Sequence, residues 1–267
     1  MTTPFRNVYD DEERARAYAE LEFPGTYYLA FRDVPQLLAR HVTGTRALDF
    51  GCGAGRSTRF LRDQGFDVVG ADISEAMLGE AAARDPRGTY LRLTGDDLSA
   101  LGSRTFDLVF AAFTFDNIPV RARRIRLFRE LATRLAPRGR FVIVVSSAEI
   151  YVNEWLSFST RDLPGNWSAK SGELVRIVML DVPDRRPVED FLWTDADYLT
   201  TFASAGLEVI DVHRPMGSAA DPFRWVSECD VAPWTIYVSG NPALGEQGAG
   251  FALHNRGAGF HGDARPA

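Results

Sequence analysis

The chain has 267 residues, of which 45% are hydrophobic and 25% charged, proportions typical of a folded globular protein rather than a disordered one. Its 36 acidic and 30 basic residues give a net charge of −6, which disfavours a nucleic-acid partner, because phosphate binding needs a basic surface. Two cysteines cannot build a disulfide framework, and no cysteine–histidine cluster predicts a metal site.

Membrane and export signals are not evident in the sequence. The longest apolar runs are far shorter than the roughly 20 residues of a membrane span, and the N-terminal segment lacks the apolar core of a signal peptide. We therefore expect a cytoplasmic protein with no membrane partner. The sequence gives no indication of its oligomeric state.

Residues 1–40 have a polar, helical pattern with interspersed aromatics, and Asp33 is a candidate N-cap for a helix that continues through Leu38. Short apolar strands then alternate with helices. We expect strands at 46–50, 66–71, 90–93, 106–113 and 141–145, helices at 57–64, 75–84 and 121–136, and a turn at 137–139. Such alternation predicts βαβ crossovers and a parallel sheet.

The regular alternation of strands and helices ends after residue 147. Residues 151–171 are irregular and aromatic, and extended runs at 174–180 and 188–193 predict a hairpin-like excursion. Thr194 then caps a helix that ends near Gly206, and strands are expected at 207–212 and 234–238. Residues 241–267 are rich in glycine and poor in apolar residues, so we expect a flexible tail.

The most informative segment is LDFGCGAGR at 48–56, where a strand ends and a helix begins. A dinucleotide site favours G-x-G-x-x-G, but the sixth position counted from Gly51 is Arg56. Asp49 lies in the mouth of this loop, which disfavours a diphosphate and favours a cation. A sulfonium amino acid, with positive charges on sulfur and nitrogen, suits such a site.

Two further strand ends carry carboxylates. Asp72 follows the second strand, where an acidic side chain can accept hydrogen bonds from a ribose diol. Asp96 follows the third strand and is placed to accept from an exocyclic amine such as that of adenine, while the backbone N–H of Asp97 could donate to the ring. Together these groups predict a site for a nucleoside joined to an amino acid.

The ordered segments LDFGCGAGRS, VVGADIS, TGDDL, FDLVFAAF and LAPRGRFVIVV resemble the motifs of the class I S-adenosylmethionine-dependent methyltransferases over about residues 40–147. The resemblance implies an α/β, Rossmann-like sheet of seven mostly parallel strands, the last antiparallel, with helices on both faces. It implies S-adenosylmethionine as cofactor. The residues expected at that cofactor are Asp49, Gly51, Gly53, Gly55, Asp72, Ile73, Asp96, Asp97 and Phe113; Gly51 and Gly53 would line the methionine part, Ile73 the adenine, and Phe113 the methionine end.

The acceptor side matches no signature. We expect a small-molecule acceptor, methylated on oxygen or nitrogen in specialised metabolism, in an apolar pocket under the N-terminal segment and an inserted cap. The aromatic side chains expected to shape that pocket are Tyr9, Tyr28, Phe115, Tyr151 and Trp155.

Asp116 is the first candidate for a general base, because it follows the fourth strand; Glu149, Tyr151 and His213 are further candidates. Arg32 is interpreted either as a partner of the cofactor carboxylate or as a partner of a surface acid. Cys52 is interpreted as a small buried residue in a tight turn.

One domain is expected over 1–240. It comprises a helical lid at 1–40, a cofactor-binding core at 41–147, an acceptor-side cap at 148–193 and a final helix and strands at 194–240, followed by the tail. The alternatives are a nucleotide-dependent Rossmann oxidoreductase, which the missing third glycine disfavours, and a non-catalytic protein that binds S-adenosylmethionine.

Overall fold

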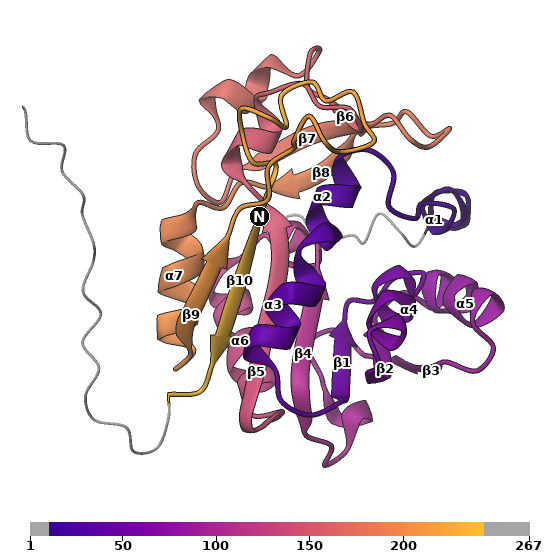
Figure 1. Cartoon of the computed structure of the whole chain (residues 1–267), viewed down its shortest axis with the longest axis vertical. Coiled ribbons are helices and arrows are strands. Elements are labelled where there is room, and N and C mark those ends of the chain that lie inside the picture. Colours follow the sequence, from indigo (N-terminus) through magenta and orange to yellow (C-terminus); the bar gives the residue numbers. More distant parts are fainter. Residues whose placement is uncertain (1–10, 243–267) are drawn as a thin grey trace, which may run out of the picture.

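A computed structural model describes residues 11–242 (Figure 1). Its centre is a seven-stranded sheet, in which β10 is antiparallel to both neighbours and the other strands share one direction. In spatial order the strands are β3 (Thr89–Arg92), β2 (Asp67–Asp72), β1 (Arg46–Phe50), β4 (Phe106–Ala112), β5 (Leu135–Ser146), β10 (Trp234–Gly240) and β9 (Glu208–His213). The predicted Rossmann-like sheet, with its last strand antiparallel, is confirmed.

Seven α-helices lie among these residues: α1 (Glu12–Ala19), α2 (Thr26–Arg32), α3 (Val34–His41), α4 (Arg56–Asp63), α5 (Glu75–Arg84), α6 (Arg121–Ala132) and α7 (Asp195–Ser204). The start of α7 is fixed by a capping box between Thr194 and Asp197. Asp33 precedes α3 as expected but does not cap it, because its carboxylate is held by Arg32 and His213.

Helices cover both faces of the sheet, as predicted, and alternation along β5 shows why. Val142 and Val144 face the apolar cluster that contains α2 and α3, whereas Phe141, Ile143 and Val145 face the cluster that contains α6 and α7. Successive side chains of a strand point to opposite faces, so a strand buried on both sides is apolar throughout.

A three-stranded antiparallel sheet made of β6 (Phe158–Ser159), β7 (Leu174–Met179) and β8 (Val188–Phe191) lies beyond the carboxyl ends of the central strands (Figure 1). The hairpin of β7 and β8 agrees with the predicted excursion, whereas β6 was not predicted. Along β7, Val175, Ile177 and Met179 are buried and the residues between them are more exposed. This three-stranded sheet, called the insert below, thus packs one apolar face against the rest of the chain.

The prediction that the helix at 121–136 reaches Ala136 is wrong. The helix ends at Ala132, and β5 begins at Leu135, which pairs with Phe106 of β4. The expected turn at 137–139 is an irregularity within this strand: Arg138 has a φ of 69°, and the register with β4 shifts before Leu108. Such an insertion of extra residues is a bulge, which local sequence patterns do not separate from a turn.

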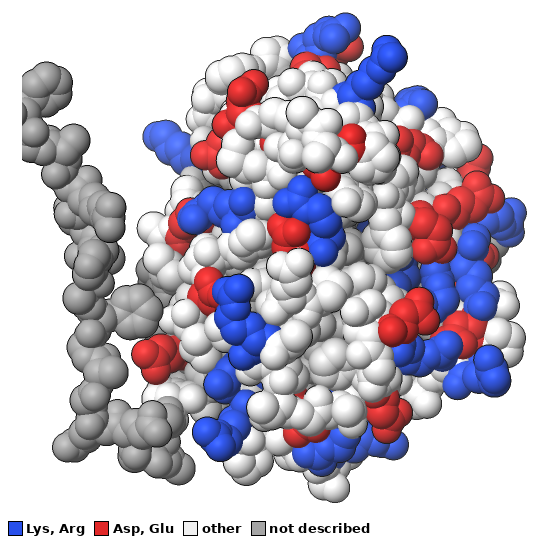
Figure 2. Space-filling view, in the orientation of Figure 1, with Lys and Arg blue, Asp and Glu red and all other residues white. Residues whose placement is uncertain are grey.

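Acidic and basic side chains intermix on the face shown in Figure 2 and do not gather into one basic patch. No helix within residues 11–242 is both long enough and apolar enough to cross a bilayer. The expected flexible tail lies outside the described residues, apart from Asn241 and Pro242.

The packing of α6 makes a direct stability prediction. Phe128 is fully buried, and its ring centre lies 4.7 Å from that of Phe115, 5.0 Å from Phe141 and 4.9 Å from Phe202. Phe128→Ala should lower the free energy of unfolding by about 3–5 kcal/mol in urea titrations, because it leaves a cavity among these rings. Leu199→Ala, at an exposed position of α7, should change it little; equal effects of the two variants would contradict this account of the core.

Candidate active site

The loop between β1 and α4 turns sharply on glycines. Gly51, Gly53 and Gly55 have φ values of 72°, 52° and 77°, in the left-handed region that favours glycine. The Gly51 N–H donates to the carbonyl oxygen of Ala71 at 2.7 Å, and a Cβ at Gly51 would lie 2.3 Å from Oγ1 of Thr114. The loop is therefore held tightly between β2 and the segment after β4.

Gly51 and Gly53 line a cavity, but Gly55 does not. Gly55 precedes the first residue of α4, and a Cβ there would lie 2.6 Å from the Tyr90 hydroxyl. The expected cofactor contact of Gly55 is therefore corrected: this glycine permits the close packing of α4 on its neighbours.

Asp72, at the end of β2, faces the same cavity. Its two carboxylate oxygens accept the backbone N–H groups of Gly53 at 2.9 Å and Ser74 at 2.8 Å. These bonds fix the orientation of the carboxylate at the cavity. Ile73, the next residue, also lines the cavity.

Asp49 lies beneath the loop rather than on the cavity wall, which corrects the expectation that it faces the ligand. Its Oδ2 accepts from the hydroxyls of Ser57 at 2.7 Å and Thr58 at 2.6 Å, while Oδ1 has no hydrogen-bond partner among the described residues. Burial raises the pKa of Asp49 to about 6. Asp49 can influence a ligand through its charge but not through direct contact.

The two aspartates of the turn after β3 have different surroundings. Asp96 lines the cavity and accepts from Nε of Arg123 at 2.7 Å. Asp97 points elsewhere: its carboxylate accepts from Ser99, and its backbone N–H donates to the Thr94 carbonyl at 3.1 Å. The N–H that was expected to meet the ligand ring is thus already used, and the assignment of Asp97 is corrected.

The cavity continues from the glycine loop into an apolar chamber. Phe113, with a φ of 61°, lies where the two parts meet, directly after β4. The apolar walls of the chamber come from seven separate elements or turns of the chain, namely Tyr27, Phe31, Phe113, Ile150, Phe158, Ile177, Met179, Val188 and Trp234. The chamber is therefore enclosed by the N-terminal helices, the insert and β10.

Of the four expected acceptor aromatics that the structure describes, only Tyr151 lines this chamber. Tyr9 lies outside the described residues. Tyr28 packs on Phe223 instead, with ring centres 5.3 Å apart. Its place at the chamber is taken by Tyr27, one position earlier on the same helix.

Phe115 and Trp155 are buried core residues that do not reach the chamber. Phe115 stacks on Phe50, with ring centres 5.9 Å apart, on the opposite face of the sheet. The indole N–H of Trp155 donates to the Ile150 carbonyl at 2.8 Å. Both expectations failed because an aromatic side chain in a loop can pack into the hydrophobic core instead of lining a pocket, and its sequence position does not distinguish the two.

Asp116, the first candidate base, does line the cavity and is buried. It accepts from the Ser146 N–H at 3.1 Å and from the Tyr198 hydroxyl at 3.1 Å, one donor to each carboxylate oxygen. Burial raises the pKa of Asp116, and these hydrogen bonds oppose the rise.

Asp190, on β8, is a second buried carboxyl group at the cavity, and the sequence analysis missed it. Its Oδ2 accepts from the Tyr151 hydroxyl at 3.1 Å. Burial raises the pKa of Asp190 to about 7, and the neighbouring charge of Asp116 contributes to the rise. The alternation of β8, in which Val188 and Asp190 are buried and Glu189 is exposed, is the sequence signal that would have found it.

Comparisons with known proteins agree with this geometry. A family model described as a methyltransferase domain matches residues 48–143. The chain is 29% identical over 133 residues to 2-methyl-6-phytyl-1,4-hydroquinone methyltransferase of Synechocystis, covering 47% of this chain and 41% of that protein. It is 28% identical over 218 residues to trans-aconitate 2-methyltransferase of Variovorax paradoxus, covering 76% and 75%.

Solved structures share the whole fold. The CcbJ methyltransferase of Streptomyces caelestis has a TM-score of 0.58 at 20% identity, covering 86% of this chain and 96% of that one. The glycopeptide N-methyltransferase MtfA, solved with S-adenosylmethionine, has a TM-score of 0.56 at 15% identity, covering 90% and 100%. Residues 48–143 thus match a methyltransferase domain, and the chain has the Rossmann-like fold of the class I S-adenosylmethionine-dependent methyltransferases.

S-adenosylmethionine is the methyl donor of proteins with this domain and fold, and the side chains at the cavity fit it. Asp72 offers oriented oxygens for hydroxyl donors, and Asp49 adds a buried carboxyl with one unpartnered oxygen beneath the loop. The chain spans less than half of the length of the first of these relatives.

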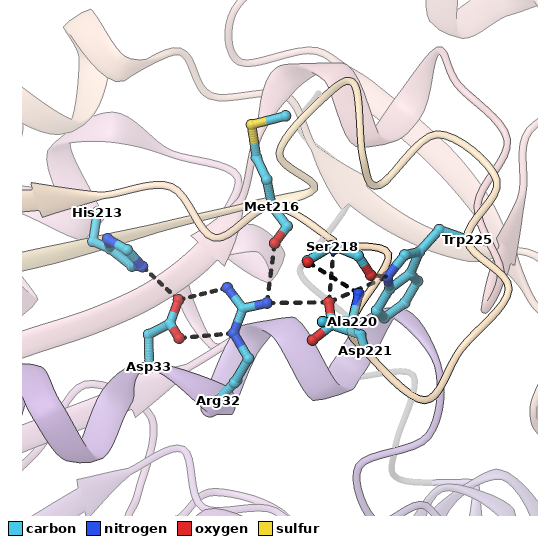
Figure 3. Close-up of polar contacts among 8 residues, drawn as sticks. All are labelled: Arg32, Asp33, His213, Met216, Ser218, Ala220, Asp221 and Trp225. Carbon is cyan, nitrogen blue, oxygen red and sulfur yellow. Dashed lines mark hydrogen bonds and ion pairs between the residues drawn. The ribbon is translucent and has the colours of Figure 1, made fainter.

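Arg32, weighed as a partner of the donor carboxylate, pairs with surface acids. Figure 3 shows its guanidinium bound to Asp33 and Asp221 and to the carbonyl of Met216. His213, one candidate base, lies with Nε2 2.7 Å from Asp33 in the same cluster. Glu149, another candidate base, is exposed; none of these side chains lines the cavity of the methyltransferase.

Arg56 is the cation that lines the cavity beside the glycine loop. Its guanidinium donates to the Glu22 carbonyl at 2.6 Å and to the Tyr18 hydroxyl at 3.2 Å, and lies 4.8 Å from the centre of the Tyr27 ring. It forms no salt bridge within the described residues. From the sequence, Arg56 was noted only as the residue that breaks a dinucleotide motif.

Cys52 is buried as expected.

The raised pKa of Asp49 predicts a specific pH dependence of stability. Because the folded-state pKa, about 6, exceeds the ordinary value of 3.8, the wild-type protein loses stability as pH rises from about 4 to 6. Asp49→Asn removes this loss. The free energy of unfolding of Asp49→Asn relative to wild type should therefore increase by about 1 kcal/mol between pH 5 and pH 7.5, in urea titrations without ligand. Leu199→Ala, an exposed substitution that changes no titratable group, should show no such trend. A pH-independent difference for Asp49→Asn would contradict the raised pKa.

Proposed function

We propose that the chain transfers a methyl group from S-adenosylmethionine to an oxygen or nitrogen atom of a small molecule. The observation that carries this proposal is one continuous cavity with two chemically different ends. The first contains the glycine loop, Asp72 and Asp96; the second is the apolar chamber that contains Asp116 and Asp190. A site for binding alone has no need of the second end.

At the first end, Asp72 would accept from the ribose hydroxyls and Ile73 would contact adenine. Asp96 would accept from the adenine amine, although it also serves Arg123. Gly51, Gly53 and Phe113 would lie along the methionine part, and Arg56 would pair with the donor carboxylate. The donor supplies a methyl group already activated by a positively charged sulfur.

The residues of the chamber would align the acceptor, exclude water and, where needed, remove a proton from it. Its aromatic and aliphatic walls exclude water and align the acceptor, and such positioning supplies up to about 7–11 kcal/mol of barrier reduction. A buried carboxylate adds general-base catalysis, typically about 10²–10⁴-fold, when the acceptor must lose a proton. Asp116, the candidate from the sequence, is one such group.

A specialised metabolite as acceptor is part of the same proposal, supported by the structural likeness to a glycopeptide N-methyltransferase. The oxidoreductase alternative is set aside, because the family is that of methyltransferases. A non-catalytic binding role lacks a reason for the acceptor chamber.

Removal of the Asp72 charge tests donor binding. Asp72→Asn should weaken binding of S-adenosylhomocysteine, measured by titration calorimetry, about 10–100-fold, since hydrogen bonds to charged groups contribute about 1.5–3 kcal/mol. The control is Asp67→Asn, at the exposed start of the same strand, which should bind like wild type. Unchanged affinity in Asp72→Asn would refute the assigned site.

A further inference from the structure

The two carboxyl groups of the chamber differ in how well they are satisfied. Both oxygens of Asp116 accept hydrogen bonds, from Ser146 and Tyr198. The guanidinium of Arg124 adds a favourable charge to Asp116 from behind; it is itself stacked between Trp193, at 4.2 Å, and Tyr198, at 4.4 Å. Asp116 thus has a donor on each oxygen and a favourable neighbouring charge, and Asp190 has neither.

Asp190 has one donor only. The Tyr151 hydroxyl bonds to Oδ2, and within residues 11–242 no hydrogen bond reaches Oδ1. Asp190 is nevertheless buried, and it lines the cavity beside apolar side chains of the insert, including Ile177 and Val188. Oδ1 is not among the fully buried, unpartnered side-chain atoms of the described residues, so it is open to the cavity, where a ligand can supply its donor.

Charges on the surrounding elements add to this requirement. Asp116, on the turn Phe115–Asn117, acts on Asp190 through its charge. Tyr151, on the turn Ala148–Tyr151, acts on Asp190 through a hydrogen bond. On β7 the paired residue is the apolar Val175, and Arg176 instead forms a salt bridge with Glu189, both partly exposed. Arg124 and Tyr198 lie on the far side of Asp116. Two acidic groups that influence each other therefore line the chamber, and the favourable charge of Arg124 acts on Asp116.

We propose that Asp190 binds the amino group of the methyl acceptor and takes its proton, so that the acceptor is a small apolar or aromatic amine. This inference rests on the function proposed above and specifies its acceptor. An ammonium group supplies both the missing donor and the missing positive charge. An alcohol supplies only the donor, and a carboxylate acceptor would be repelled.

The chemistry balances without another reactant. A proton passes from the bound ammonium to the Asp190 carboxylate, which leaves a lone pair on nitrogen. The amine nitrogen then forms the N–CH₃ bond as the S–CH₃ bond breaks, and the electron pair of that bond stays on sulfur to give a neutral thioether. Asp190 returns its proton to water. Its raised pKa makes it a stronger base than an ordinary aspartate.

Binding of three probes with one skeleton tests the proposal without knowledge of the natural acceptor. The probes are 3-phenylpropylamine, 3-phenylpropan-1-ol and 3-phenylpropanoate, each titrated into the full chain saturated with S-adenosylhomocysteine at pH 8. We expect the amine to bind at least tenfold more tightly than the alcohol, and the acid to bind most weakly. In Asp190→Asn the amine should lose at least tenfold in affinity, and the alcohol less than threefold.

Glu189→Gln, on the opposite face of the same strand, is the matched control and should bind all probes like wild type. Tyr151→Phe provides a second readout: loss of the hydroxyl that stabilises ionised Asp190 should move the pH midpoint of amine binding upward, whereas a purely structural role would not. An amine that binds no better than the alcohol, including no detectable binding of any probe, overturns the proposal. So does an amine preference that survives in Asp190→Asn. Absence of S-adenosylhomocysteine binding would instead refute the proposed function, and this inference with it.

Discussion

Buried acidic groups gathered at one edge of a parallel sheet are the constraint on which the rest of this structure depends. Because β1, β2 and β4 run in the same direction, Asp72 and Asp116 follow strands that end at one edge, and Asp49 lies just beneath it. Each carboxylate is oriented by backbone N–H groups or hydroxyls, yet few cations neutralise them. Such an edge favours a positively charged ligand over a diphosphate.

The three-stranded insert completes the apolar chamber next to this edge of the sheet. β7 and β8 close the chamber with apolar side chains and contribute one carboxyl group, Asp190, which no strand of the central sheet supplies. The N-terminal helices close another side through Tyr27 and Phe31. In the proposed assignment the central sheet would hold the donor and the segments around it would shape the acceptor site, which places substrate choice on the less regular parts of the chain.

The sequence predicted the sheet and the glycine loop well, because period and motif are local properties. It placed Asp72 and Asp96 correctly at the cavity for the same reason: strand ends are fixed by topology. Aromatics in irregular segments were predicted poorly, since Tyr27 and Tyr28 differ by one position on a helix and only tertiary packing decides which faces the chamber. Asp190 was missed because the alternation of β8 points it inward only once the insert is packed on the central sheet, and its partner Tyr151 is 39 residues away.

A crystal structure of the complex with S-adenosylhomocysteine tests the central claim most directly. The account predicts the ribose hydroxyls in hydrogen-bond contact with the Asp72 carboxylate, and the sulfur at the junction marked by Phe113, open to the chamber that contains Asp190. A nucleoside bound elsewhere, or a sulfur facing away from that chamber, would contradict the assignment of the two ends of the cavity.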